Sequence, residues 1–311
     1  MLRDIISIED AIMSSHIKTA LLFALMIVIS LLFGWAVGYL TGDMSWGITF
    51  FVGFLVYQLV FVVFSRPITL AAVGARPLDP GESLQAQMVH NIVEELSIAA
   101  GLPKPQVGVI ESEVPNAFAT GLTPRSGIVV VTRGIVNMMN REELSGVLAH
   151  ELSHIKHRDI VVGTIAGVLA LSLMLSVRLI MRLAFWGLMP HGRDRDREDR
   201  NPLGMVLAIL IIIMAPIAAM MVRFAISRER EYMADAGSAM ITRNPFALAD
   251  ALEKLKIYHE SSYRRLKVPE EFSHMFIFDP LFGVNSMLHS LFATHPPIEE
   301  RIKRLRSMTA L

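Results

Sequence analysis

The sequence predicts an α-rich, multi-pass membrane protein carrying an α+β domain that is split by an apolar helical hairpin. Hydrophobic residues make up 53% of the 311 residues, above the ~45–50% that is usual in soluble domains. Residues 19–42 and 44–65 contain no charged side chain, and as helices both are long enough to cross a hydrocarbon core of ~30 Å. A further apolar region, 160–226, lies between two stretches of mixed composition.

This pattern divides the chain into four parts. Residues 1–65 are predicted to form a membrane hairpin of two spans with a tight turn at Asp43. Residues 66–159 and 227–311 are the two halves of one α+β domain, and 160–226 is the hairpin between them. A cleaved signal peptide is the alternative for the first apolar stretch. The stretch exceeds the ~7–15 apolar residues of a signal peptide, and a second span follows at once, so a membrane hairpin is favoured.

The region 160–226 admits two interpretations. Residues 160–177 and 201–222 are its most apolar parts, and the run "HGRDRDREDR" at 191–200 is typical of a solvated loop. Arg178 directly follows 160–177. This part can therefore cross the membrane only if the guanidinium of Arg178 reaches the membrane–water interface. The region either crosses the membrane twice or forms a shallow re-entrant hairpin.

The mixed stretches contain recognisable helices and strands. The helix signals are an apolar stripe, a Ser, Thr or Asn cap and Gly or Pro stops, and they place helices at 82–103, 140–157, 244–260 and 294–308. Asn140 followed by Glu143 forms a capping-box pattern at the start of the second helix. Short runs rich in branched residues predict strands at 106–112, 116–122 and 127–134.

Charge and cysteine usage limit the chemistry. The chain has 29 basic and 29 acidic residues, so global electrostatics does not favour a nucleic-acid partner. It has no cysteine, which excludes disulfides, thiolate nucleophiles and Cys-ligated zinc. Any bound metal must therefore be held by histidine and carboxylate side chains.

The segment "HELSH" at 150–154 has the pattern of a metal site. On a helix, His150 and His154 lie one turn apart and can offer ring nitrogens to one ion. Zinc accepts such ligands and keeps a position for water. Glu151 lies on the adjoining face, where it can take a proton from that water. The alternative is a helix surface with two solvated histidines.

A third ligand is required, and two candidates follow the apolar region. Glu231 and Asp235 in "SREREYMAD" are again four residues apart, so one can bind the metal while the other holds a ligand histidine by its free N–H. A solvated, charged helix start is the alternative. His157 lies roughly 10 Å beyond His150 along the helix axis, so it is predicted to be a helix-end residue near the membrane surface.

The motifs "HELSHIKHRD", "REREYMAD", "NAFATG" and "THPP…RI" together resemble the HtpX-type membrane zinc metalloproteases of the gluzincin group, relatives of the CAAX prenyl endopeptidases. The resemblance covers nearly the whole chain and implies a zincin-like domain. It implies that one Zn²⁺ per chain is bound by His150, His154 and Glu231. Glu151 would be the general base, and Asp235 would hold a ligand histidine.

The resemblance also implies three further roles. Asn116 and Ala117 would lie beside the substrate strand, and His295 would lie near the oxyanion. For Asn116 the alternative is a turn residue, and for His295 it is a rigid His-Pro-Pro start of the last helix.

The expected function is a zinc endopeptidase of the cell (inner, cytoplasmic) membrane, with its site on the cytoplasmic face. The resemblance implies quality control, in which misfolded or damaged membrane proteins are hydrolysed. A strand such as 127–132 is predicted to bind unfolded substrates by edge pairing. The expected partners are therefore protein substrates and the lipid bilayer, with no nucleic acid.

Three other classes compete with this expectation. An intramembrane protease would bury the motif in an apolar span, whereas "REEL" and "KHRD" flank it here. A CAAX-type prenyl protease shares the site but needs more spans around a large chamber. A non-catalytic membrane scaffold or holdase with structural zinc has no need of Glu151.

The composite site constrains the topology. If residues on both sides of 160–226 bind one ion, this region crosses the membrane an even number of times. Arg66 and Arg76 follow the second span, which places the site inside by the positive-inside rule. The four arginines of 191–200 would then lie outside, against that rule.

Overall fold

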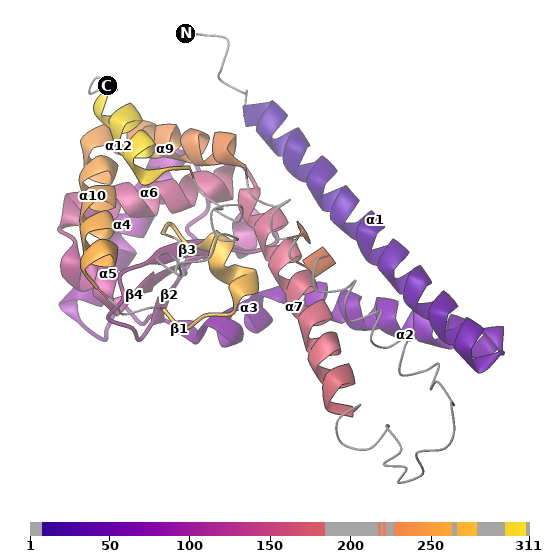
Figure 1. Cartoon of the computed structure of the whole chain (residues 1–311). Helices are drawn as coiled ribbons and strands as arrows, with labels where there is room; N and C mark the ends of the chain where they lie inside the picture. The colour runs from indigo at the N-terminus through magenta and orange to yellow at the C-terminus, as the bar shows by residue number, and fades with distance from the viewer. Residues whose placement is uncertain are drawn as a thin grey trace.

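The computed structural model describes residues 8–183, 217–218, 220–221, 227–262, 266–278 and 296–308. Within these residues, long helices extend away from a mixed α/β domain (Figure 1). The long helices are α1 (Ile8–Thr41), α2 (Met44–Val63) and α7 (Asp159–Leu183). The other elements are α3 (Ser65–Val73), β1 (Ala75–Pro77), α4 (Leu84–Ala100), β2 (Gln106–Ile110), β3 (Ala117–Thr120), η1 (Pro124–Ser126), β4 (Ile128–Thr132), α5 (Arg133–Met138), α6 (Arg141–Lys156), α9 (Arg228–Thr242), α10 (Pro245–Ser261), η3 (Glu270–Met275) and α12 (Ile298–Arg306).

Three helices among the described residues are long and apolar enough to cross a membrane: α1, α2 and α7. The first two confirm helices in the stretches 19–42 and 44–65, and that these helices span the membrane stays a prediction. α1 nevertheless begins at Ile8, so its first turns precede the uncharged stretch. Ser15 in these turns contacts Arg230 and His157 of the α/β domain.

The hairpin of α1 and α2 is tightly built at its turn and along its contact. Asp43 caps α2, and its carboxylate accepts a hydrogen bond of 2.9 Å from the backbone N–H of Ser45. A Cβ added to Gly34 would lie 2.6 Å from the carbonyl oxygen of Gly47. Glycine at this position therefore allows the two helix backbones to approach closely.

α7 starts where the apolar region was predicted and continues to Leu183, beyond the predicted end of its first part. Most of 201–222 and all of the loop 191–200 lie outside the described residues. The choice between two crossings and a re-entrant hairpin therefore stays a prediction.

Four strands form one sheet in the order β1-β2-β4-β3. β2 and β4 are parallel, and the β1–β2 and β3–β4 pairs are antiparallel. The predicted strand at 127–132 is β4, which has a neighbour on each side, so the expectation that it pairs with a substrate along a free edge is wrong. β3 lies at the edge, and its Phe118 forms a bridge with Phe276. β1 was not predicted, because three residues are too few to show a period-2 pattern.

The predicted helices of the α/β domain are present with their caps. Ser83 accepts a hydrogen bond from the N–H of Ala86 at the start of α4. The capping box of Asn140 and Glu143 opens α6, and Asn244 caps α10. These caps satisfy backbone groups that have no partner inside the helix, and they fix the start of the helix that carries the "HELSH" segment.

The sheet separates two apolar cores. Val129 and Val131 of β4 pack into a core shared with α4, α6, α10 and α12. The alternate residues Ile128 and Val130 pack into a second core shared with α1, α3 and α7. This alternation follows from the period of two in a strand. One face of β4 therefore packs on the helices of the α/β domain, and the other belongs to the core that contains the long helices.

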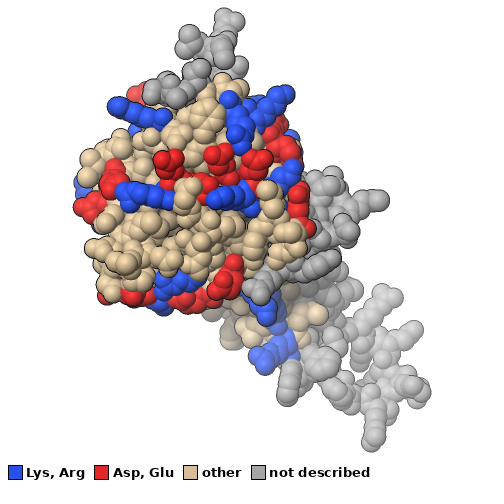
Figure 2. Space-filling model, turned by 90° about the vertical axis from the view of Figure 1, so that its left-hand side faces the viewer, with Lys and Arg blue, Asp and Glu red and all other residues tan. Residues whose placement is uncertain are grey.

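The surface of the α/β domain carries charges of both signs. Figure 2 shows basic and acidic side chains lying next to each other in a band across the face turned away from the long helices. Ion pairs of this kind join α10 to α12, for example Lys256 with Glu299 at 2.8 Å and Arg306 with Glu253 at 2.6 Å. No single sign dominates this face.

Candidate metal centre

α6 holds three of the predicted site residues in the interior. His150 and Glu151 are 1% and 2% exposed, and His154 follows His150 by one helical turn. Leu148 and Leu152 of the same helix are fully buried in the domain core. The apolar residues of α6 therefore fix its rotation, and this rotation determines where the two imidazoles point.

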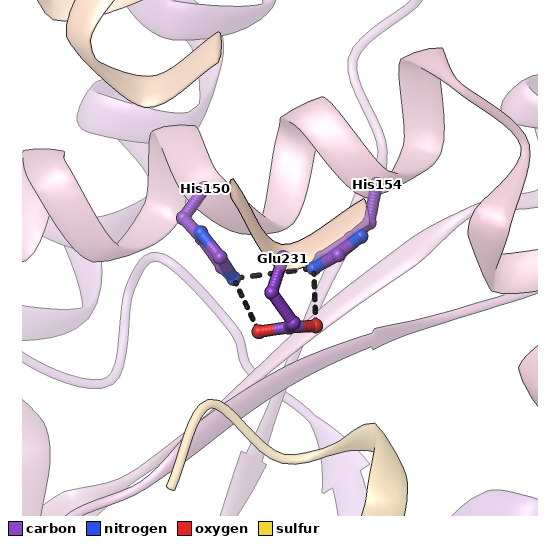
Figure 3. A group of neighbouring side chains, drawn as sticks. All are labelled: His150, His154 and Glu231. Atoms are coloured by element: carbon purple, nitrogen blue, oxygen red, sulfur yellow. Dashed lines mark hydrogen bonds and ion pairs between the residues drawn. The ribbon is translucent and has the colours of Figure 1, made fainter. Parts of the chain in front are cut away.

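His150, His154 and Glu231 converge on one point (Figure 3). The Nε2 atoms of the two histidines are 3.1 Å apart. Glu231 Oε2 lies 3.8 Å from His150 Nε2, and Glu231 Oε1 lies 3.5 Å from His154 Nε2. One donor atom from each residue lies within 4.8 Å of the other two. Imidazole nitrogen and carboxylate oxygen are donors that zinc accepts.

Glu231 reaches this point because α9 packs closely against α6. A Cβ added to Gly237 would lie 2.1 Å from Ser153 Oγ, so glycine is needed where the helices meet. The hydroxyl of Ser238 donates a 2.7 Å hydrogen bond to the carbonyl of Gly146 and joins the helices further along. Glu231 lies in the first turn of α9, where the helix dipole stabilises a negative charge.

A buried ion pair orients His150. The Nδ1 atom of His150 lies 3.0 Å from Asp235 Oδ1, which leaves Nε2 to face the point of convergence. Arg301 of α12 donates to both oxygens of Asp235, at 2.7 and 2.9 Å. Burial alone would raise the pKa of the Asp235 carboxyl, but the charge of Arg301 and the hydrogen bond from His150 hold that pKa below its usual value.

A second carboxylate orients His154. Asp159, the first residue of α7, lies 3.1 Å from His154 Nδ1 through its Oδ2 atom. Its other oxygen accepts a hydrogen bond from Arg230 of α9. Each histidine is thus held at Nδ1 by a carboxylate, and each carboxylate is paired with an arginine. A carboxylate that binds the free N–H of the imidazole is typical of metal-ligating histidines.

The electrostatics of the ion-free centre favour a cation. Burial lowers the pKa of His150 to about 4, so this imidazole is neutral at pH 7. Burial acts in the same direction on His154, but Asp159, Glu231 and Glu151 outweigh it and raise the pKa of His154 to about 9. The surplus of carboxylates thus draws a positive charge onto His154. A bound divalent cation would supply this positive charge instead, and His150, His154 and Glu231 would hold it, so the residues present fit a metal.

Glu151 lies beside the proposed ligands and is buried with them. Burial raises the pKa of its carboxyl to about 7, with the charge of Glu231 adding to this effect and that of His154 opposing it. The backbone N–H of Ala119 on β3 donates to the Glu151 carboxylate. Glu151 therefore connects the histidine-bearing helix to the edge of the sheet.

The residues of the centre border a cavity of about 60 Å³. This volume is large enough for water molecules. Its walls come from α6, β3, η3 and the first turns of α7 and α9, and the lining residues include Ala119, His150, Glu151, His154, Glu231 and His274. The cavity thus contains potential metal donors, a carboxyl with a raised pKa and the edge of a sheet.

Asn116 and Ala117 contact the chain's own segment that follows η3. Asn116 is fully buried, and its side-chain amide donates to the carbonyl of Phe278 at 2.8 Å. The carbonyl of Ala117 accepts a 2.9 Å hydrogen bond from the N–H of Ile277. Both residues therefore hold the segment after η3, whose Ile277 lines the cavity, against β3.

His157 is the C-cap of α6 and is buried, which confirms the prediction of a helix-end residue. His295, predicted near the oxyanion, lies outside the described residues.

Sequence reasoning did not identify Asp159, Arg230 or Arg301 as parts of the centre. Asp159 and Arg301 stand inside motifs that were recognised, "HELSHIKHRD" and "THPP…RI", but nothing in the spacing shows that they face the histidines. An arginine separated from its partner by scores of residues gives no local signal, because the contact depends on the packing of α12 against α9.

Comparisons with known proteins agree with the geometry. Residues 83–309 match the model of peptidase family M48. A "Protease HtpX homolog" of Thermoanaerobacter pseudethanolicus is 44% identical over 274 residues, covering 85% of this chain and 87% of that protein. One of Pyrococcus furiosus is 43% identical over 293 residues, covering 94% and 95%. The crystal structure of S. mikatae Ste24p matches with a TM-score of 0.47 at 24% identity, covering 94% of this chain and 65% of that one.

The family match spans more than half of the chain, and the relatives are similar over nearly all of it. These findings confirm the resemblance that the motifs indicated. The chain belongs to peptidase family M48 and is a membrane metalloprotease of the HtpX type.

Proposed function

We propose that the protein is a zinc endopeptidase that cleaves misfolded or damaged membrane proteins at the cytoplasmic face of the cell membrane. The observation that carries this proposal is the convergence of two histidine Nε2 atoms and the Glu231 carboxylate beside a buried Glu151. In this proposal His150, His154 and Glu231 hold the metal. When bound, zinc would supply a Lewis acid that polarises a peptide carbonyl and lowers the pKa of water.

Glu151 is the proposed general base. Glu151 lines the same cavity as the proposed ligands, so its carboxylate can accept a proton from a water there and return it. Glu151 therefore takes a proton from the attacking water and delivers it to the amine that leaves the cleaved peptide bond. His154 and Glu231 are held in place by their helices and do not exchange protons in this scheme.

The edge of the sheet supports binding of an extended substrate. β3 lies at the edge of the sheet, where the chain's own segment after η3 contacts its outer side at Ala117 and Phe118, and Ala119 of this strand lines the cavity. A peptide that pairs with β3 is recognised through its backbone and independently of its sequence, which suits unfolded substrates. Asn116 and Ala117 would shape one end of this edge, and His295 is proposed to donate to the developing oxyanion.

The long helices support this location. α7 begins at Asp159, directly beside the centre, so the site lies close to the end of a membrane span. A site at the bilayer surface reaches the water-exposed loops of membrane proteins. We place this surface on the cytoplasmic side on the basis of Arg66 and Arg76.

The proposal is tested with the purified full-length protein in detergent. We expect cleavage of casein, loss of cleavage with a chelator, recovery with Zn²⁺, and no cleavage by the Glu151→Gln variant. A prenylated CAAX peptide offered in parallel tests the related protease class. If zinc-loaded wild-type protein leaves casein intact but cleaves the prenylated peptide, the proposed substrate class is wrong. If it cleaves neither, the proposed activity is wrong.

A further inference from the structure

The two histidines of the centre are supported in different ways. His150 is held by Asp235, which is paired with Arg301, and both residues belong to the α/β domain. His154 is held by Asp159, which is paired with Arg230. Arg230 in turn contacts the first long helix. The Nη1 atom of Arg230 donates a 2.7 Å hydrogen bond to the hydroxyl of Ser15 in α1.

Ser15 is placed to connect several elements at once. It is 1% exposed, and its hydroxyl also donates to the carbonyl of His157 at 3.3 Å. The neighbouring His16 lies 3.0 Å, through Nε2, from Nη1 of Arg158. Two consecutive residues of α1 therefore contact the turn that joins α6 to α7.

This turn sets the direction of Asp159. α6 ends at the C-cap His157, and Arg158 has a left-handed backbone with φ of 61°. The left-handed residue reverses the chain so that α7 starts at Asp159, with its carboxylate between His154 and Arg230. Such a conformation is strained for a residue other than glycine and persists only where the surroundings hold it. The contacts from Ser15 and His16 supply that restraint.

The length of α1 explains how a membrane helix reaches the site. The uncharged stretch begins at residue 19, whereas the helix begins at Ile8. The intervening turns extend roughly 16 Å beyond the apolar part at 1.5 Å per residue. Figure 1 shows this end of α1 lying beside the α/β domain, near the start of α9.

We propose that the first membrane helix is a structural part of the metal centre, in which Ser15 positions Arg230, Arg230 positions Asp159, and Asp159 orients His154. This inference rests on the proposed role of His154 as a metal ligand. Ser15 is a positioning residue, because it acts on His154 through Arg230 and Asp159. A displacement of α1 should therefore loosen the metal at His154 and leave the support of His150 intact.

The test is the zinc affinity of the full-length protein, measured by competition with a calibrated chelator. Ser15→Ala should weaken zinc binding at least about threefold, as for residues coupled in one hydrogen-bond network. Ser15→Thr, which retains the hydroxyl, should restore most of the affinity. Ser14→Ala is the matched control, since within the described residues the Ser14 side chain forms no hydrogen bond. It should bind zinc as the wild type does.

A double-mutant cycle separates positioning from general destabilisation. Asp159→Ala alone should cost ~10–100-fold in affinity, the usual effect of removing a carboxylate that holds a ligand histidine. If Ser15 acts through Asp159, adding Ser15→Ala to that variant should cost nothing more. Full additivity of the two losses would overturn the proposal.

The remaining outcomes are also distinguishable. Wild-type protein that binds no zinc would reject the proposed function itself. Wild-type protein that binds zinc, together with a Ser15→Ala variant of unchanged affinity, would reject only the role of α1. If Ser15→Ala does not fold, the nearly isosteric Ser15→Cys, a poor hydrogen-bond partner, takes its place with the same expected loss.

Discussion

Arg301 and Asp235 form a buried ion pair through two nitrogen atoms, at 2.7 and 2.9 Å, and this pair joins the last described helix to the metal centre. The arginine is 2% exposed and the aspartate 3% exposed. The pair therefore lies in a low-dielectric environment, where the loss of one partner leaves the other charge buried and uncompensated.

Replacing Arg301 should destabilise the fold more than an ordinary surface change. For Arg301→Ala we expect a loss of about 3–5 kcal/mol in the free energy of unfolding. The measurement is thermal or denaturant unfolding of the metal-free protein in detergent. Lys303→Ala, an exposed position on the same helix, is the control and should change stability by no more than ~0.5 kcal/mol. Equal effects at the two positions would argue against a structural role for the pair.

Metal content should separate the base from the ligands. Glu151→Gln should retain about one zinc per chain, because Glu151 is assigned no place among the donors. His154→Ala and Glu231→Ala each remove a donor and should lose zinc as well as activity. Elemental analysis of the purified variants gives the answer. A zinc-free Glu151→Gln variant that is otherwise folded would place Glu151 among the ligands.

Asp235→Ala tests the orientation of His150. Removing the carboxylate that holds Nδ1 should weaken zinc retention by ~10–100-fold without abolishing binding. Chelator competition measures this loss. An unchanged affinity would mean that Asp235 serves only to neutralise Arg301.

The raised pKa of Glu151 predicts a pH-dependent cost of keeping this group buried. Its folded-state pKa of about 7 exceeds the unfolded value, so the folded state binds the proton more tightly. The wild type should therefore lose stability relative to Glu151→Gln as the pH rises from ~4.5 to 7, by up to about 3 kcal/mol.

This pH effect is measured as the difference in unfolding temperature between the metal-free variant and the wild type. The difference should be largest above pH 7 and small near pH 4. Glu142→Gln, which changes an exposed carboxylate on the same helix, is measured alongside as the control for the substitution itself. A difference that does not vary with pH would contradict a raised pKa.

Cysteine labelling tests the topology, and the absence of native cysteine makes single reporters unambiguous. We expect cysteines at positions 43 and 196 to be labelled from outside, and cysteines at 80 and 260 only after permeabilisation. Labelling of 80 and 260 from opposite faces would contradict a metal centre shared by both halves of the domain. Labelling of 196 only from inside would favour the re-entrant hairpin.

The sequence predicted the parts of the fold that leave local signals. The capping box at Asn140, the apolar stripe of α4 and the uncharged spans each depend on neighbouring residues. The convergence of His150 and His154 was predictable for the same reason, because a helix of known period fixes their relation. The distance from either histidine to Glu231 could not be predicted, because it depends on how closely α9 packs against α6.

The errors in the prediction also have physical causes. Branched, apolar runs mark a strand but do not reveal its neighbours, so β4 was expected at an edge although it lies in the interior of the sheet. Asp159, Arg230 and Arg301 were missed because ion pairs such as that of Asp159 with Arg230 join residues far apart in the chain. Only the packed structure brings them together.

The alternation along β4 has a practical consequence for anyone who isolates the catalytic part of this enzyme. Ile128 and Val130 belong to the core that the long helices help to form, so a fragment cut free of α1 and α7 would open this core to water. Such a fragment is expected to aggregate or to recruit detergent at the opened core. A water-soluble version would need polar replacements on the face of the sheet that belongs to this core.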